Sequence, residues 1–197
     1  MHAIKSVIFL FLFKMINLPN VIGIVGPIRA GKTTTASYLV ERYGYSLASN
    51  SDVLRRILGG MQIIPTRENL ARLGNSIFEV FGNDVIAKYR LERLDLGRIV
   101  VDGIRYSDEL KYYLENSDFK LLGIEANADV RFERTLRGSE EFKDVRICRD
   151  EFDLLALSRS ELNVPQLLSM ADELISNAND IKQLRKKVDQ ILNKWLY

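Results

Sequence analysis

Short apolar runs alternate with longer stretches of helical periodicity along most of the chain. The apolar runs predict strands at residues 21–25, 46–48, 98–101, 119–125 and 173–175. Between these runs, apolar residues recur at intervals of three and four, which is typical of helices with one buried face. This alternation predicts an α/β fold in which a mostly parallel, five-stranded sheet lies between layers of helices.

The helix boundaries follow from turn and capping residues. The first helix is expected at residues 32–42, with Gly44 well suited to end it. The polar cluster Asn50-Ser51-Asp52 predicts the start of a second helix. Pro65-Thr66 predicts a longer helical region reaching about residue 95, with a break at Gly82-Asn83. A last helix is predicted from apolar residues that form one core-facing stripe, namely Ile181, Leu184, Val188, Ile191 and Trp195.

One octet carries a specific chemical signal. Residues 26–33, Gly-Pro-Ile-Arg-Ala-Gly-Lys-Thr, match the phosphate-loop pattern G-x-x-x-x-G-K-[ST] and lie between an apolar run and a helical pattern. Such a loop turns backbone N–H groups and a helix N-terminus toward a phosphate. Lys32 would reach the β- and γ-phosphates, and the Thr33 hydroxyl would ligate Mg²⁺. We therefore predict that the chain binds ATP with Mg²⁺ through Gly26, Arg29, Ala30, Gly31, Lys32, Thr33 and Thr34.

A second candidate site follows the predicted strand at residues 98–101. Asp102 comes at the carboxyl end of this strand, the edge at which ligands bind in open α/β sheets. We expect Asp102 to hold the metal together with Thr33, as the second acidic element of phosphate-loop enzymes does. The alternative is a turn aspartate that precedes Gly103. Arg105 would then project into the same region and bind an acceptor phosphate through two hydrogen bonds.

Arginines recur every three residues in a later helical segment. Arg131, Arg134 and Arg137 would span about 120° of one helix face. Guanidinium groups converging on the γ-phosphate would stabilise the charge of a phosphoryl-transfer transition state. The alternative is a solvated face of exposed ion pairs. Phe132 and Leu136, four residues apart, are expected to pack inward from another face of the same helix.

Composition narrows the possible chemistry. The chain has 197 residues, 28 basic and 26 acidic side chains and a net charge of +2, so we expect neither nucleic-acid binding nor a second domain. With one cysteine and one histidine, the chain lacks the residues for a usual Cys/His zinc site, and we expect neither a Ser-His-Asp triad nor a Cys-His dyad. The remaining Lys, Arg, Asp and Thr side chains suit phosphoryl transfer with a metal ion.

From Asn20 onward the chain resembles the nucleoside monophosphate kinase group. The resemblance is closest to the archaeal adenylate-kinase-related proteins and more distant to dephospho-coenzyme A kinases. Four segments carry it, namely residues 26–33, 49–55, 101–105 and 129–138. It implies a three-layer P-loop NTPase fold with a helical acceptor-binding insertion at about 50–95 and a short helical lid at about 130–152.

The resemblance also implies roles for individual residues. Arg55 and Arg105 would hold the acceptor phosphate. Asp52 would orient the acceptor or, as in dephospho-coenzyme A kinases, act as general base on a sugar hydroxyl. A phosphate acceptor is already ionised at neutral pH and needs no such base, and Asp52 could equally be a capping residue of its helix.

The predicted function is transfer of the γ-phosphate of ATP to a small phosphate-bearing acceptor, with a nucleoside or deoxynucleoside monophosphate as the first candidate. Two alternatives stay open: a dephospho-coenzyme A kinase-like transfer to a sugar hydroxyl, and a regulatory ATP-binding protein with weak ATPase activity. No guanine-binding N-K-x-D signature supports a GTPase, and no basic track supports a nucleic-acid motor.

The N-terminal residues 1–14 form an apolar extension that is distinct from the kinase-like domain predicted at 15–197. Its apolar run is shorter than the roughly 20 residues that cross a bilayer as a helix. We interpret it as an extra strand, a dimer contact or the product of an upstream start codon. We expect a cytoplasmic protein without a membrane partner, and a homodimer is one candidate assembly.

Overall fold

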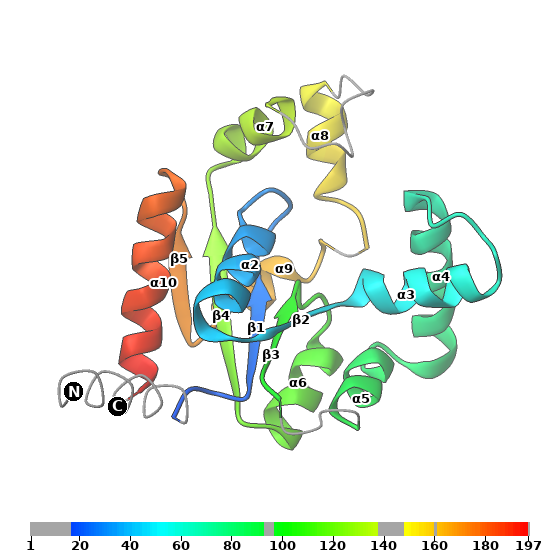
Figure 1. Cartoon of the computed structure of the whole chain (residues 1–197). Helices are drawn as coiled ribbons and strands as arrows, with labels where there is room; N and C mark the ends of the chain where they lie inside the picture. Colours follow the sequence, from blue (N-terminus) through cyan, green and yellow to red (C-terminus); the bar gives the residue numbers. More distant parts are fainter. Residues whose placement is uncertain (1–16, 93–96, 138–147, 160, 197) are drawn as a thin grey trace.

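The computed structural model describes residues 17–92, 97–137, 148–159 and 161–196 (Figure 1). The predicted N-terminal extension at residues 1–14, and with it the boundary expected at residue 15, lies outside the described residues. Part of the predicted lid, residues 138–147, lies outside them as well.

Five strands form one fully parallel sheet in the order β2-β3-β1-β4-β5. The strands are β1 (Val21–Val25), β2 (Ser46–Ser49), β3 (Ile99–Asp102), β4 (Phe119–Glu125) and β5 (Glu173–Ser176). In register, Val21 of the central strand β1 lies opposite Ile99 of β3 and Phe119 of β4. Because all strands run the same way, their carboxyl ends meet at one edge of the sheet, where an open α/β fold binds ligands.

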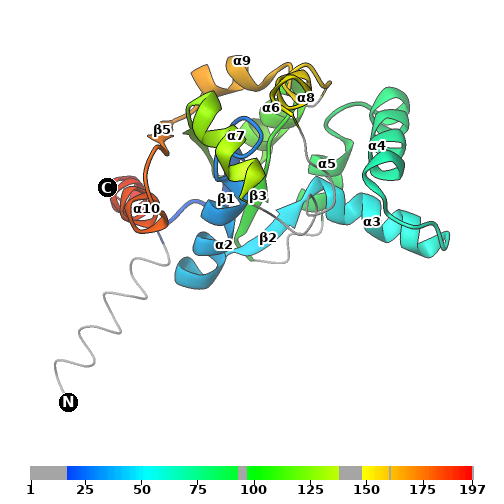
Figure 2. The ribbon, with the colours of Figure 1, turned by 90° about the horizontal axis from the view of Figure 1, so that it is seen from above.

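Helices cover both faces of this sheet. They are α2 (Lys32–Tyr43), α3 (Asn50–Gly60), α4 (Arg67–Phe81), α5 (Val85–Leu91), α6 (Ser107–Asn116), α7 (Ala128–Leu136), α8 (Arg149–Leu155), α9 (Val164–Ser169) and α10 (Ile181–Trp195). Figure 2 shows α2 and α10 on one side of the sheet and α6 and α9 on the other. Helices α3, α4 and α5 extend to one side of this body, and α7 and α8 lie above the sheet edge (Figure 1).

The sequence of β1 explains why helices cover both faces of the sheet. Successive side chains of a strand point to opposite faces. Ile22 and Ile24 join the core cluster that includes α2 and α10, whereas Val21 and Val25 join the cluster that includes α5, α6 and α9. All five residues of β1 are buried, so the strand reads as a continuous apolar run rather than an alternating one.

The predicted fold class is confirmed, and the predicted strand bounds agree with the structure to within one residue. The first helix ends at Tyr43, and Gly44 caps it in the left-handed conformation as expected. The break predicted at Gly82-Asn83 separates α4 from α5. Ile181 departs from the predicted apolar stripe, because its side chain is 49% exposed at the start of α10. None of the described helices is both long and apolar enough to cross a membrane.

Candidate active site

The phosphate-loop sequence connects β1 to α2 at the carboxyl edge of the sheet. Gly31 precedes α2 with φ 110°, a backbone conformation that residues with a side chain rarely adopt. A Cβ at this position would lie 2.4 Å from the side-chain amide nitrogen of Asn177. The amide nitrogen Nδ2 of Asn177 donates to the Ala30 carbonyl at 2.8 Å. Asn177 is buried in the segment between β5 and α10, so a distant part of the chain fixes the shape of the loop.

Two of the predicted lid arginines also contact this loop. Arg134 donates through Nη1 to the carbonyl oxygens of Arg29 and Ala30, both at 3.3 Å, and through Nη2 to that of Asn177 at 2.9 Å. Arg131 donates through Nη1 to the Ile28 carbonyl at 3.3 Å. Through these bonds, two cationic side chains lie against carbonyl oxygens of the loop. Their positive charge lies where phosphate-loop enzymes place negatively charged phosphates.

Lys32 is a buried lysine whose pKa is strongly lowered. Its side chain is 9% exposed, and Nζ donates to the Pro27 carbonyl within the same loop at 2.8 Å. Burial, and secondly the positive charge of Arg105, lower the pKa of Lys32 to about 7. A multiply charged phosphate beside Nζ would reverse this effect, because it favours the ammonium form.

Thr33 and Asp102 meet where the sequence predicted a metal site. The Thr33 hydroxyl donates to Oδ2 of Asp102 at 2.7 Å, across the gap between α2 and β3. A hydroxyl and a carboxylate are the hard oxygen ligands that Mg²⁺ prefers, and this ion commonly takes its other ligands from water and substrate phosphates. Within the described ranges, no three His, Cys, Asp or Glu side chains form a self-sufficient metal cluster. The pair therefore suits a magnesium ion that arrives with a nucleotide.

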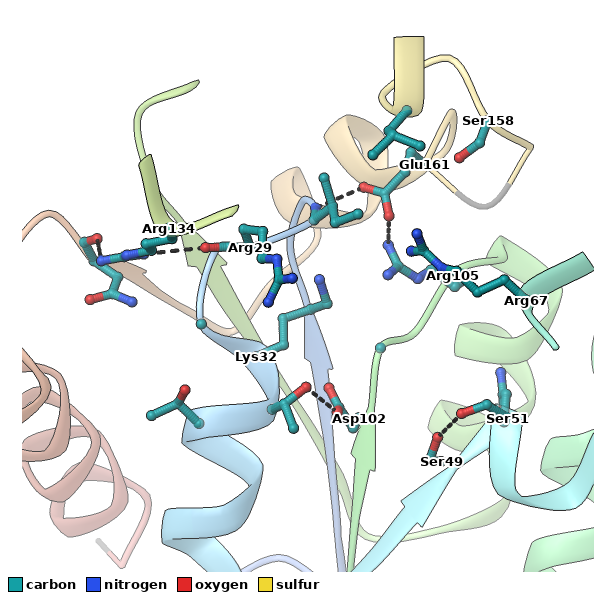
Figure 3. Close-up of a pocket in the computed structure, with 18 of the residues that line it drawn as sticks. Arg29, Lys32, Ser49, Ser51, Arg67, Asp102, Arg105, Arg134, Ser158 and Glu161 are labelled. Atoms are coloured by element: carbon teal, nitrogen blue, oxygen red, sulfur yellow. Dashed lines mark hydrogen bonds and ion pairs between the residues drawn. The ribbon is translucent and has the colours of Figure 1, made fainter. Parts of the chain in front are cut away.

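A single cavity of about 1090 Å³ connects these groups. On one side of the phosphate loop it is lined by α7 and the start of α10, and on the other by the ends of β2 and β3 and the start of α4. Figure 3 shows Arg134 on one side, Arg67 on the other and Lys32 between them. The polar and charged lining residues are Arg29, Lys32, Thr33, Thr34, Ser49, Asn50, Ser51, Arg67, Glu68, Asp102, Arg105, Arg134, Arg137, Ser158, Glu161, Asn177 and Asn179.

A model of the AAA domain family matches residues 25–146, which is more than half of the chain. A UPF0200 protein of Methanocaldococcus jannaschii is 30% identical over 89% of this chain and 90% of its own length. The chain belongs to the AAA domain family and to the UPF0200 proteins. Another UPF0200 protein, from Aeropyrum pernix, is 29% identical over 84% of this chain and 89% of its own length.

Several solved structures share the fold of this AAA domain protein. Shikimate kinase from Acinetobacter baumannii superposes with a TM-score of 0.58 at 17% identity, covering 92% of this chain and 97% of that one. A gluconokinase from Sinorhizobium meliloti gives 0.55 at 14% identity, covering 90% and 94%. The protein TT1252 from Thermus thermophilus gives 0.60 at 18% identity, covering 90% and 98%. At these identities the likeness concerns the fold alone.

The acceptor residues predicted from the family resemblance lie in two different environments. Arg105 lines the cavity, and a single buried carboxylate fixes the loop that carries it: Glu109 accepts from the Arg105 backbone N–H at 3.1 Å and from the Asn50 side chain at 3.1 Å. Arg55 and Asp52 are not among the lining residues. They pair with each other at 2.9 Å on α3, and both side chains are about half exposed.

The three arginines of the predicted lid do not share one environment either. Arg134 and Arg137 line the cavity, whereas Arg131 stacks on the Phe152 ring with its guanidinium carbon 5.5 Å from the ring centroid. Arg137 pairs with Glu133 one turn earlier at 2.9 Å, in an exposed position. Phe132 packs against Phe152 as expected, with 5.5 Å between ring centroids, but Leu136 is 58% exposed, so the prediction that it packs inward is wrong for this structure.

Sequence reasoning missed several residues that line the site. Arg67 follows the helix start predicted at Pro65-Thr66 and faces the cavity from α4. Asn177 and Glu161 contact the phosphate loop from more than 130 positions away. Only Arg67 carried a local signal, as a basic residue in the first turn of a predicted helix. The other two belong to no motif, because their contacts depend on how the chain folds back.

The lowered pKa of Lys32 leads to a prediction about ATP binding. At pH 8 the nucleotide-free protein carries mostly neutral Lys32, and the phosphates of bound ATP should raise its pKa again. We expect uptake approaching one proton per ATP bound at pH 8, falling toward zero near pH 6. Calorimetric titrations in buffers of different ionisation enthalpy measure this number. The exposed-lysine variant Lys111→Ala should keep the uptake, whereas uptake that persists in Lys32→Met would contradict the assignment.

Proposed function

We propose that this protein is an ATP-dependent kinase that transfers the γ-phosphate of ATP to a small, phosphate-bearing acceptor. The observation that carries the proposal is the continuous cavity, which joins the phosphate loop to the two cavity-lining arginines Arg67 and Arg105 beyond β3. A site that only hydrolysed ATP would not need the second cationic wall that Arg67 and Arg105 form. Such a wall is suited to a second anion, because guanidinium groups bind phosphate through paired hydrogen bonds.

On the donor side, the triphosphate would lie along the loop from Gly26 to Thr34. Lys32 would bind the β- and γ-phosphates, and Thr33 with Asp102 would hold Mg²⁺. When bound, the ion would supply Lewis-acid stabilisation of the phosphate charge. The nucleoside would extend toward Asn177, Asn179 and the start of α10, which line the same end of the cavity.

On the acceptor side, Arg105 and Arg67 would bind the acceptor phosphate. Ser49 and Ser51, whose hydroxyls lie 2.7 Å apart, would contact its hydroxyl groups. Arg55 reaches this wall indirectly, since it donates to the Ser51 hydroxyl at 3.2 Å. We propose Arg55 and Asp52 as a supporting pair behind Ser51. An ionised phosphate acceptor needs no general base, so Asp52 would not have to reach the reacting atoms.

Arg134 and Arg137 would complete the site from α7. Both line the cavity above the phosphate loop, where positive charge would stabilise the transferring phosphoryl group. Closing α7 and α8 over the two substrates would exclude water, which otherwise diverts the γ-phosphate to hydrolysis. Transfer would then proceed in line, without a covalent enzyme intermediate.

The test is ADP release from Mg-ATP with a panel of acceptors. Ribo- and deoxyribonucleoside monophosphates come first because of the family resemblance, followed by dephospho-coenzyme A and a control without acceptor. We expect turnover that depends on one acceptor class and exceeds the control by at least about 100-fold, as positioning two substrates for transfer provides. Slow ADP release that ignores every acceptor would instead indicate a nucleotide-regulated binding protein.

A further inference from the structure

Glu161 bridges the two halves of the cavity. It lies in the segment between α8 and α9, and its side chain is only 7% exposed. Oε2 accepts a hydrogen bond from the backbone N–H of Ile28, within the phosphate loop, at 3.0 Å. Oε1 forms an ion pair with Nη1 of Arg105 at 2.7 Å. Figure 3 shows the Glu161 carboxylate beside Arg105, and the two contacts together mean that one side chain contacts both the phosphate loop and Arg105.

The backbone around Arg105 is held from the same segment. Asn163, two residues after Glu161, donates through Nδ2 to the Arg105 carbonyl at 3.3 Å. The Arg105 backbone N–H is bonded to Glu109 from the other side. The main chain of Arg105 is therefore fixed at both ends, and the ion pair with Glu161 sets the direction of its guanidinium group.

Glu161 also lies among other cations of the site. Burial lowers the pKa of Lys32 and that of Arg131, and in both cases the Glu161 charge acts against this effect. A negative charge in this position reduces the mutual repulsion of Lys32 and Arg105. It thereby allows both groups to stay in one small volume before any phosphate has arrived.

We propose that Glu161 is a positioning residue that holds the Arg105 guanidinium in register with the phosphate loop and so couples the ATP site to the acceptor site. This inference rests on the proposed kinase function, because it takes Arg105 as the acceptor-phosphate ligand. Glu161 touches neither substrate in this role. It acts by fixing the position of the Arg105 guanidinium relative to the phosphate loop.

The coupling has a defined physical cause. Because in-line transfer requires the reacting atoms to approach to about 3–3.5 Å, a misplacement of 1 Å can cost about 100-fold in rate. Glu161→Gln keeps the size of the side chain and an oxygen for the Ile28 N–H, but it loses the charge that attracts Arg105. Glu161→Asp keeps the charge and shortens the side chain by one methylene group, so it cannot span both partners.

The experiment compares wild type, E161Q and E161D with E115Q. This variant replaces an exposed glutamate on α6 and serves as the matched control. Two quantities are measured on the full chain. The first is kcat and KM for ATP and for the acceptor identified by the panel. The second is the Kd of inorganic phosphate, by calorimetry, with and without a non-hydrolysable Mg-ATP analogue. Urea midpoints verify that the variants fold, and E161D replaces E161Q should the latter be unfolded.

We expect kcat/KM for the acceptor to fall by about 10- to 100-fold in both Glu161 variants, with the KM for ATP changed less than threefold. In wild type the analogue should tighten phosphate binding, and in the variants this effect should disappear. Three outcomes would each overturn the proposal. The kinetics could be unchanged in the Glu161 variants, or ATP and phosphate affinity could be lost equally. The third is that the analogue has no effect on phosphate binding in wild type. A coupling of phosphate to ATP without turnover of any acceptor would leave Glu161 in this role and overturn the kinase function instead.

Discussion

Lys32→Ala should lower the rate of phosphoryl transfer by about 100- to 1000-fold, the range observed when one preorganised electrostatic group is removed from an active site. Lys32 is the proposed ligand of the β- and γ-phosphates, and its present partner is a backbone carbonyl that a phosphate can replace. Steady-state assays with saturating acceptor measure the effect. Lys111→Ala, which removes a lysine exposed on α6, should retain wild-type turnover.

The same variant should not be less stable than wild type. The pKa of Lys32 is about 7 in the folded chain, below its usual value of 10.5, so between these values the unfolded chain binds the additional proton. The contribution of Lys32 to wild-type stability should therefore rise with pH from about 7 toward 10, and the cost of burying its charge is greatest below pH 7. Urea unfolding of Lys32→Ala at pH 6.5 should give a midpoint at or above that of wild type. A clearly lower midpoint would mean that lost activity reports damage to the fold.

Gly26→Ala should destabilise the fold by about 3 kcal/mol or more, the upper end of the range for overpacking. A Cβ at this position would lie 2.0 Å from the carbonyl oxygen of Ile124, a backbone atom near the carboxyl end of β4. Neither partner can move away freely, because Gly26 directly follows β1, which pairs with β4, and Ile124 itself pairs with Ile175 of β5. Urea unfolding followed by circular dichroism measures the change.

Gly59→Ala is the matched control for this substitution. Gly59 lies in α3, and a Cβ there would meet no heavy atom within 4 Å. Alanine is favoured over glycine in a helix by roughly 0.5–1 kcal/mol, so this variant should be slightly more stable than wild type. Equal stability of the two alanine variants would contradict the steric argument at Gly26.

The sequence pattern predicts most of the fold, because strands buried on both faces are read directly from apolar runs. Val21–Val25 and Phe119–Glu125 were predicted with the bounds that the structure has. The order of the strands in the sheet, unlike their bounds, cannot be read from apolar runs. That β1 lies between β3 and β4 depends on crossover connections, and no local pattern along the chain encodes it.

The candidate site was predictable only where its residues belong to a motif. The structure brings Thr33 into contact with Asp102, the two residues predicted as metal ligands from a phosphate loop and a strand-ending aspartate. Arg55 was expected in the acceptor site, yet a carboxylate one turn away on the same helix offers an ion pair that needs no ligand. Glu161 has no motif at all, and only the folded chain brings it to the phosphate loop.

The bonds that shape the phosphate loop also set the order in which the protein can become competent during synthesis. The loop lies near the start of the domain, but Asn177 and Glu161 contact it across 147 and 133 positions of the chain. A nascent chain that has exposed β1 and α2 alone possesses the nucleotide-binding sequence without the residues that hold it in shape. Because these long-range contacts require both partners, we expect the phosphate loop to be held in shape only after Asn177 has left the ribosome.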